Sequence, residues 1–150
     1  MRAEDYFAIQ NQLNRYFQYV DAGDFERCGE LFTHADLIYT QSGQTYSKDP
    51  AGITQQMRSF VKLYGEAQTP LTRHHSGNII IEPDGENRAK TSCSAIIFQS
   101  TETLPLQAIA EASYYDRFEK RKQGWVFTER NMSLNFMGDM AHHLLRKVST

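Results

Sequence analysis

The stretch that decides the fold is TRHHSGNIII, residues 72–81, where the pattern of the chain changes. Before it, apolar residues recur at helical spacing. From Leu71 onward the chain runs in long segments rich in apolar and β-branched residues, separated by turn residues. The three isoleucines at the end of the stretch predict a buried strand. Because consecutive side chains of a strand point to opposite faces, only one of His74 and His75 can face a given interior.

Amphipathic helices are predicted before this stretch. Apolar residues from Tyr6 to Val20 recur at three- and four-residue steps, which indicates a helix of about 16 to 18 residues with one buried face. Gly23 ends that helix, and Asp24 is a suitable N-cap for a second one. The elements expected before residue 72 are helices over residues 6–20, 25–32 and 50–64 and short strands at residues 37–40 and 44–46.

Long strands are predicted from residue 74 onward. The expected strands cover residues 74–82, 90–99, 107–119 and 125–136, and a short helix is expected from Asp139, with apolar residues continuing to Val148. Helices followed by antiparallel strands predict an α+β fold, with residues 1–150 forming one domain. A meander of four long strands curls easily, and three helices can cover its concave side. Such a sheet encloses a cavity.

The composition argues against several classes of binding partner. The chain has 150 residues with 16 basic and 18 acidic side chains, a net charge of −2 that predicts no binding to nucleic acid or to a membrane surface. No stretch approaches the roughly 18 apolar residues that span a bilayer. Cys28 and Cys93 form neither a disulfide framework nor a metal-spaced cluster, so no metal is expected. A cytoplasmic location is expected.

Three motifs, taken in order, resemble the SnoaL-like group of the nuclear-transport-factor-two-like superfamily. They are Tyr16-Phe17-x-x-x-Asp21, Thr72-Arg73-His74, and Trp125 followed by Arg130-Asn131. The resemblance spans nearly the whole chain. It implies a cone-shaped α+β barrel, in which a curved, mostly antiparallel sheet wraps around N-terminal helices and leaves an internal pocket. Similar enzymes include scytalone dehydratase, bile-acid 7α-dehydratase, hexachlorocyclohexane dehydrochlorinase and SnoaL-type polyketide cyclases, which use no metal and no organic cofactor.

The resemblance also implies site residues. In the dehydratase and dehydrochlorinase relatives a histidine takes a substrate proton and an aspartate orients it, and the matching positions are His74 and Asp21. The bile-acid dehydratase pattern can instead be aligned on His75. Tyr16 matches a position that acts on the leaving group. Arg130 matches an arginine that lines the dehydrochlorinase pocket and could bind an anion or oxyanion.

Several alternatives stay open at this stage. Arg130 could equally pair with Glu111 or Asp116 across the sheet. No second pocket histidine is evident on the later strands, and the adjacent His142 and His143 are interpreted as surface or interface residues. Strand alternation alone suggests further pocket-lining residues, which are Tyr39, Asn78 and Tyr114.

The residues and the resemblance together favour an enzyme. An imidazole with an ordinary pKa of ~6.5 suits proton abstraction near neutral pH, and a carboxylate partner fixes its tautomer. We expect a cofactor-independent lyase or isomerase, such as a dehydratase, acting on a small, mostly apolar substrate that could be cyclic. The alternatives are a non-catalytic small-ligand-binding or assembly module of the same fold, and a polyketide-cyclase-like enzyme. The exposed sheet face predicts a homodimer or homotrimer.

Overall fold

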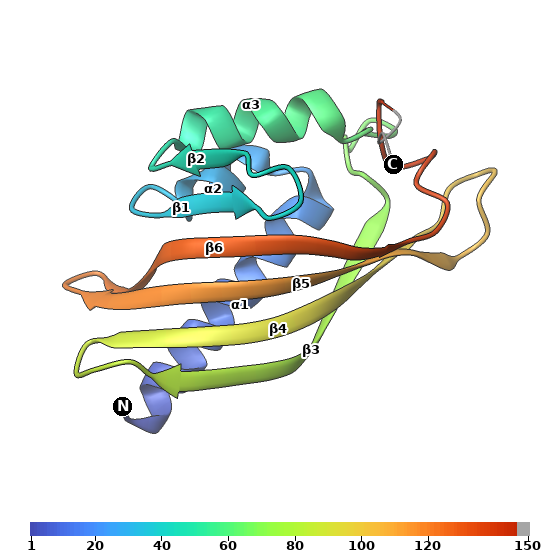
Figure 1. Ribbon diagram of the computed structural model, residues 1–150. Helices are drawn as coiled ribbons and strands as arrows, with labels where there is room; N and C mark the ends of the chain where they lie inside the picture. Colours follow the sequence, from blue (N-terminus) through green and yellow to red (C-terminus); the bar gives the residue numbers. More distant parts are fainter. Residues whose placement is uncertain (147–150) are drawn as a thin grey trace.

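The computed structural model describes residues 1–146, in which helices come first and long strands follow (Figure 1). The helices are α1 (Ala3–Ala22), α2 (Phe25–Glu30) and α3 (Pro50–Phe60). The strands are β1 (Asp36–Tyr39), β2 (Thr45–Ser47), β3 (Thr72–Pro83), β4 (Arg88–Gln99), β5 (Gln107–Arg121) and β6 (Gly124–Met137). The order of elements confirms the α+β prediction.

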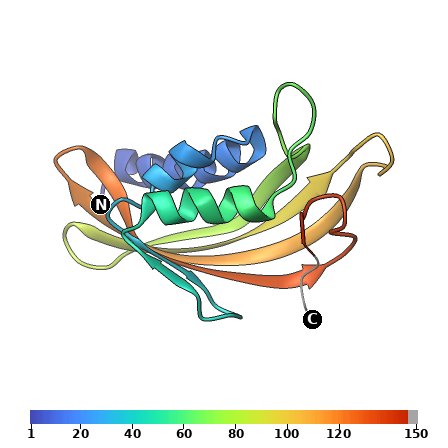
Figure 2. The same ribbon diagram turned by 90° about the horizontal axis from the view of Figure 1, so that it is seen from above.

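All six strands form one sheet in the order β2-β1-β6-β5-β4-β3. The long strands pair antiparallel, and β1 runs parallel to β6, so an early strand joins the last one. The sheet is curved and the three helices lie on its concave side (Figure 2). A curved, mostly antiparallel sheet wrapped around N-terminal helices is therefore what the chain adopts.

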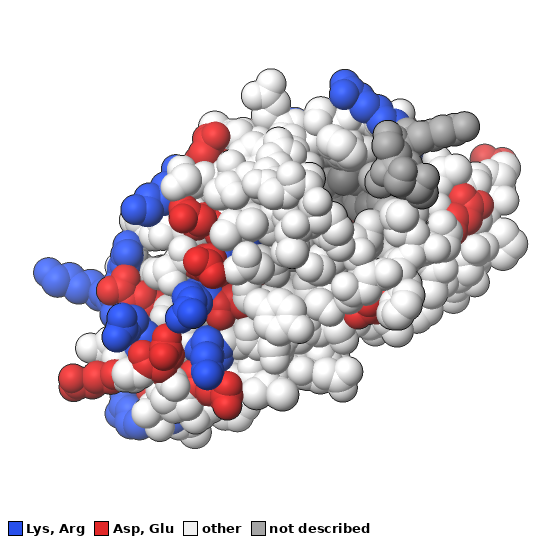
Figure 3. All heavy atoms as spheres, in the orientation of Figure 1, with Lys and Arg blue, Asp and Glu red and all other residues white. Residues whose placement is uncertain are grey.

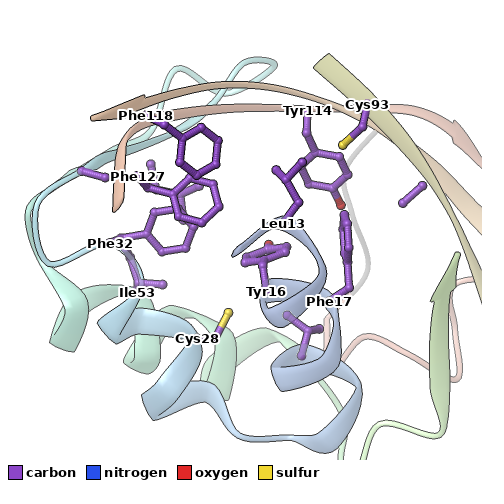
Figure 4. Close-up of a cluster of buried hydrophobic side chains, with 14 of the residues drawn as sticks. Leu13, Tyr16, Phe17, Cys28, Phe32, Ile53, Cys93, Tyr114, Phe118 and Phe127 are labelled. Carbon is purple, nitrogen blue, oxygen red and sulfur yellow. The ribbon is translucent and has the colours of Figure 1, made fainter. Parts of the chain in front are cut away.

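The helix α1 supplies one wall of the core. Its buried face includes Ile9, Leu13, Tyr16 and Phe17, spaced at the helical period that the sequence predicts. Figure 4 shows Tyr16 and Phe17 pointing toward the aromatic side chains of the sheet, and the Phe17 and Tyr114 rings lie 5.2 Å apart edge to face. Burial of these large rings anchors α1 across the sheet and fixes where its C-terminal end lies.

Two predicted helical regions differ from expectation. The third helix ends at Phe60 rather than at Tyr64, because Val61 is extended and pairs as an isolated bridge with Leu144. The tail from residue 138 to 146 forms turns instead of a helix. Val148 lies outside the described residues.

The isoleucine run is also less buried than predicted. A bulge between Gly77 and Ile80 shifts the register of β3, and Ile80 is 56% exposed. A bulge adds an unpaired residue and changes which face the following side chains occupy.

Among residues 1–146, no helix combines the length and the apolar character needed to cross a membrane.

Candidate active site

A cavity of about 600 Å³ lies between the sheet and the helices, within the size range of small-molecule sites. Its wall comes from α1, β1, α3, the strands β3 to β6, and the tail. Much of that wall is apolar and includes Met57, Ile97, Met132, Leu134, Met137 and Met140. Within the part of the chain that the structure describes, no Lys, Arg, Asp or Glu side chain lines the cavity. The cavity therefore suits an uncharged, mostly apolar ligand.

His74 and Asp21 are in direct contact at the cavity. The Nδ1 atom of His74 lies 2.6 Å from Oδ1 of Asp21, and the backbone N–H of His74 donates to Oδ2 at 2.8 Å. His74 lines the cavity, whereas Asp21 lies behind it. A carboxylate only accepts hydrogen bonds, so neutral His74 carries its proton on Nδ1 and keeps the lone pair on Nε2. That tautomer is the one a general base needs.

Asp21 stands at the C-terminal end of α1, where the helix dipole disfavours a negative charge. Three donors offset this, because the Thr72 hydroxyl also donates to Oδ1 at 2.8 Å. Burial raises the pKa of the Asp21 carboxyl, but its hydrogen bonds and charge interaction with His74, with the Thr72 bond, outweigh burial and lower the pKa. Asp21 is therefore a carboxylate at neutral pH and can stabilise an imidazolium at His74.

The imidazole of His74 is held from a second side by α1. Phe17 stacks on it with ring centroids 5.5 Å apart, and the His74 side chain is only 8% exposed. Because the imidazole is stacked on Phe17 and its Nδ1 is bonded to Asp21, the position of Nε2 is fixed as well. His74 is thus fixed by both neighbours before any ligand arrives.

Three tyrosines, Tyr16, Tyr39 and Tyr114, line the same cavity, and strand alternation predicts this position for Tyr39 and Tyr114. Burial is the main cause that raises the pKa of each phenol, so all three stay protonated near neutral pH. The Tyr39 hydroxyl donates to Oε1 of Gln56 at 3.0 Å. The phenols of Tyr16 and Tyr114 can supply neutral hydrogen-bond donors to a ligand.

Arg130 is not among the residues that line the cavity. Its guanidinium is fully buried and makes a bidentate pair with Asp116, at 2.7 and 2.8 Å. It packs behind the cavity wall, with Cζ 4.2 Å from the Tyr16 ring centroid and 4.7 Å from that of Tyr114. The structure therefore shows the cross-sheet ion pair, and the partner of Arg130 is Asp116 rather than Glu111.

Asn78 and His75 lie away from the cavity. Asn78 is exposed at the bulge of β3 with a positive φ of 53°, so the prediction that it lines the pocket is wrong. Strand alternation was the basis of that prediction, and the bulge interrupts the alternation. His75 is exposed and contacts Phe98, with ring centroids 5.5 Å apart. Between the two adjacent histidines, only His74 lines the cavity.

His143 is the residue that sequence reasoning missed. The sequence predicts a surface or interface residue here, yet His143 is only 8% exposed and lines the cavity. Burial, and then the nearby His74, lower the pKa of His143 to about 4. The apolar neighbours Met140 and Leu144 were a sign of burial in the sequence, but only contact with α3 and β4 places this segment over the cavity.

Metal ligands are not clustered in the described chain: residues 1–146 hold no group of three or more His, Cys, Asp or Glu side chains placed to bind a metal. Cys28 and Cys93 are both buried and unbridged. The titratable side chains at the cavity are the imidazoles of His74 and His143, three phenols, and the Asp21 carboxylate behind His74.

Solved structures share this architecture. An NTF2-like protein with a cystatin-like fold from Novosphingobium aromaticivorans is 20% identical, with a TM-score of 0.71 over 92% of this chain and 86% of that one. A protein named as a candidate scytalone dehydratase from the same species is 22% identical, with a TM-score of 0.67 over 89% of this chain and 86% of that one. A protein named as a candidate aromatic ring hydroxylase, also from that species, is 17% identical, with a TM-score of 0.72 over 95% and 98% of the two chains. At these identities the likeness establishes the fold.

No curated protein matches the sequence of this chain. A family model does match it: the model of the SnoaL-like domain covers residues 1–131, which include α1 and its Asp21, all of β3 to β5, and most of the cavity wall. The fold and this match agree with the resemblance noted in the sequence. The chain belongs to the SnoaL-like domain family.

Proposed function

We propose that this protein is a cofactor-independent lyase that eliminates water, or a similar small leaving group, from a neutral and mostly apolar substrate. The observation that supports this most is the His74–Asp21 contact of 2.6 Å at the wall of an uncharged cavity. A buried carboxylate behind an imidazole is costly unless the pair is used or fully satisfied. Nε2 of His74 has no hydrogen-bond partner among the described residues, so its lone pair can accept a substrate proton.

The elimination can be written for a β-hydroxy ketone. His74 Nε2 accepts the proton from the carbon next to the carbonyl, the C–H electron pair forms an enolate double bond, and the carbonyl π pair moves to oxygen. The enolate pair then returns and expels the β-hydroxyl. The leaving hydroxyl takes the proton from His74 and departs as water, which leaves an enone and regenerates the enzyme.

Each neighbour has a part in this scheme. Asp21 stabilises the imidazolium that forms at His74, as carboxylates do beside catalytic histidines. Tyr16, whose phenol is protonated and lines the cavity, donates a hydrogen bond to the leaving oxygen. Because the wall holds no charged side chain among the described residues, a neutral ketone fits this site better than a carboxylate or a phosphate.

The test uses a neutral bicyclic β-hydroxy ketone, 3-hydroxy-1-tetralone, whose enone product tautomerises to 1-naphthol, and follows the formation of 1-naphthol by absorbance. We expect His74→Ala to lower kcat by about 1,000-fold, within the range of general-base removal. The matched control is His75→Ala, because His75 is exposed on the same strand and does not line the cavity. Equal activity of His74→Ala and wild type, with both variants folded by circular dichroism, would sink the proposal.

A further inference from the structure

The tail, residues 138–146, is fastened over one end of the cavity. Leu144 forms an isolated bridge with Val61, and the Lys62 N–H donates to the His143 carbonyl at 2.9 Å. The Tyr64 hydroxyl donates to the carbonyl of His142. Each of these bonds ties the tail to the residues that follow α3, so the side chain of His143 is presented by a fixed backbone.

His143 enters the cavity wall from this tail, whereas His74 enters it from β3. Its Nδ1 is enclosed by protein and has no hydrogen-bond partner among the described residues. An unsatisfied buried N–H is rarer and costlier than an unsatisfied acceptor, so the proton belongs on Nε2. With a pKa lowered to about 4, chiefly by burial, the ring is neutral near pH 7 and acts as a donor without charge.

We propose that His143 is a second substrate-contacting residue, whose neutral imidazole N–H donates a hydrogen bond to the carbonyl oxygen of a ketone while His74 removes the adjacent proton. The inference rests on the proposed function and supplies the donor that the developing oxyanion needs. An enolate forms only if the developing oxyanion is stabilised, and a donor aimed at that oxygen is the usual device. No cationic side chain among residues 1–146 lines the cavity to do so.

His143 takes no part in the proton balance. The proton moves from carbon to His74 and then to the leaving hydroxyl, and His143 keeps its own proton throughout. A neutral donor also suits this position, because a second imidazolium beside His74 would oppose the positive charge that forms there. Among the described residues, the charged groups that shift the pKa of His143 are His74, which lowers it, and Asp21, which raises it.

The experiment separates this role from turnover by using two ligands that cannot eliminate. 1-Tetralone carries the carbonyl and no leaving hydroxyl, and tetralin is the matching hydrocarbon. We expect His143→Phe, which keeps a ring of similar size, to weaken binding of 1-tetralone by about 10-fold and to leave tetralin binding unchanged in isothermal titration. His143→Gln, which keeps an N–H donor, should restore part of the preference for the ketone.

A spectroscopic readout on 1-tetralone does not depend on the stability of the His143 variants. With 1-tetralone labelled with carbon-13 at the carbonyl, infrared difference spectra of wild type should show the carbonyl band shifted to lower frequency, and ring-nitrogen NMR should show the His143 donor signal move. His74→Ala should keep both effects, even if lyase activity proves absent. An unshifted carbonyl band, failure of wild type to bind 1-tetralone, or equal losses for both ligands in His143→Phe would overturn the inference.

Discussion

At the scale of single residues, Asp116 and Arg130 form an ion pair in which neither side chain is exposed. The guanidinium lies among the rings of Tyr16, Tyr114 and Phe127, with its Cζ 4.9 Å from the centroid of Phe127. Removing two charges from water is expensive, and the pair is favourable only while both members are present. Arg130 therefore supports the tyrosines of the cavity wall from behind.

We expect Asp116→Asn to lower the free energy of unfolding by about 3 to 5 kcal/mol, because it leaves the Arg130 charge buried and unpaired. Urea unfolding at pH 7.5 measures this. The control is Glu111→Gln, at the other predicted partner, which should change stability by less than about 0.5 kcal/mol. A double variant, Asp116→Leu with Arg130→Met, should recover much of the loss; a double variant as unstable as Asp116→Asn would contradict this explanation.

At the scale of elements, the end of α1 decides where Asp21 lies. Gly23 caps the helix with a φ of 72°, and its N–H bonds to the carbonyl of Val20 at 3.0 Å. A Cβ atom at this position would stand 2.3 Å from the backbone carbonyl oxygen of Gln68. Both the left-handed conformation and the close approach require glycine. The cap lies two residues from the carboxylate that holds His74.

We expect Gly23→Ala to destabilise the fold by about 2 to 4 kcal/mol, from backbone strain plus a clash with rigid backbone, and to reduce activity by displacing Asp21. Thermal unfolding and turnover of the same sample measure the two effects. Gly43→Ala is the matched control, since Gly43 has a φ of 70° but no atom within 4 Å of an added Cβ, and should cost only about 1 kcal/mol. Equal losses in both variants would show that the clash is unimportant.

At the scale of the whole molecule, one face has a charged end and a mostly uncharged end. In Figure 3 the charged side chains gather at the end of the sheet that holds the β3–β4 and β5–β6 turns, and the other end of that face is mostly uncharged. Exposed apolar side chains of the sheet include Ile96, Tyr115 and Phe136. The homodimer or homotrimer expected from an exposed sheet face stays a prediction. The cavity opens on the concave side, where the tail and the helices meet the sheet.

The stability of the fold should depend on pH through His143, which lies in the tail. The folded pKa of His143 is about 4, below its ordinary value of 6.5, so below pH 6.5 the unfolded chain binds the proton more readily. Stability should therefore fall as the pH drops from about 6.5 to 4. We expect wild type to lose about 2 to 3 kcal/mol more than His143→Phe between pH 7.5 and 4.5.

Urea unfolding of both proteins at the two pH values measures this difference. Asp21 has a lowered pKa, so its contribution is present above pH ~4 and is lost only below it, outside this window. The matched control is His142→Phe at the neighbouring position, which should keep the wild-type dependence. A His143→Phe protein with the same pH dependence as wild type would show that His143 is not buried in its neutral form.

The sequence by itself determined the α+β order, most helix and strand positions to within a few residues, and the facing of Tyr39 and Tyr114. Those features follow from periodicity, and the expected site residues came with the family resemblance. Only the tertiary structure decided the rest. A bulge removed Asn78 from the wall, Asp116 rather than Glu111 paired with Arg130, and a tail fastened behind α3 brought in His143. The reason is that local patterns report which face of an element is buried, whereas the choice of partner depends on where elements distant in sequence meet.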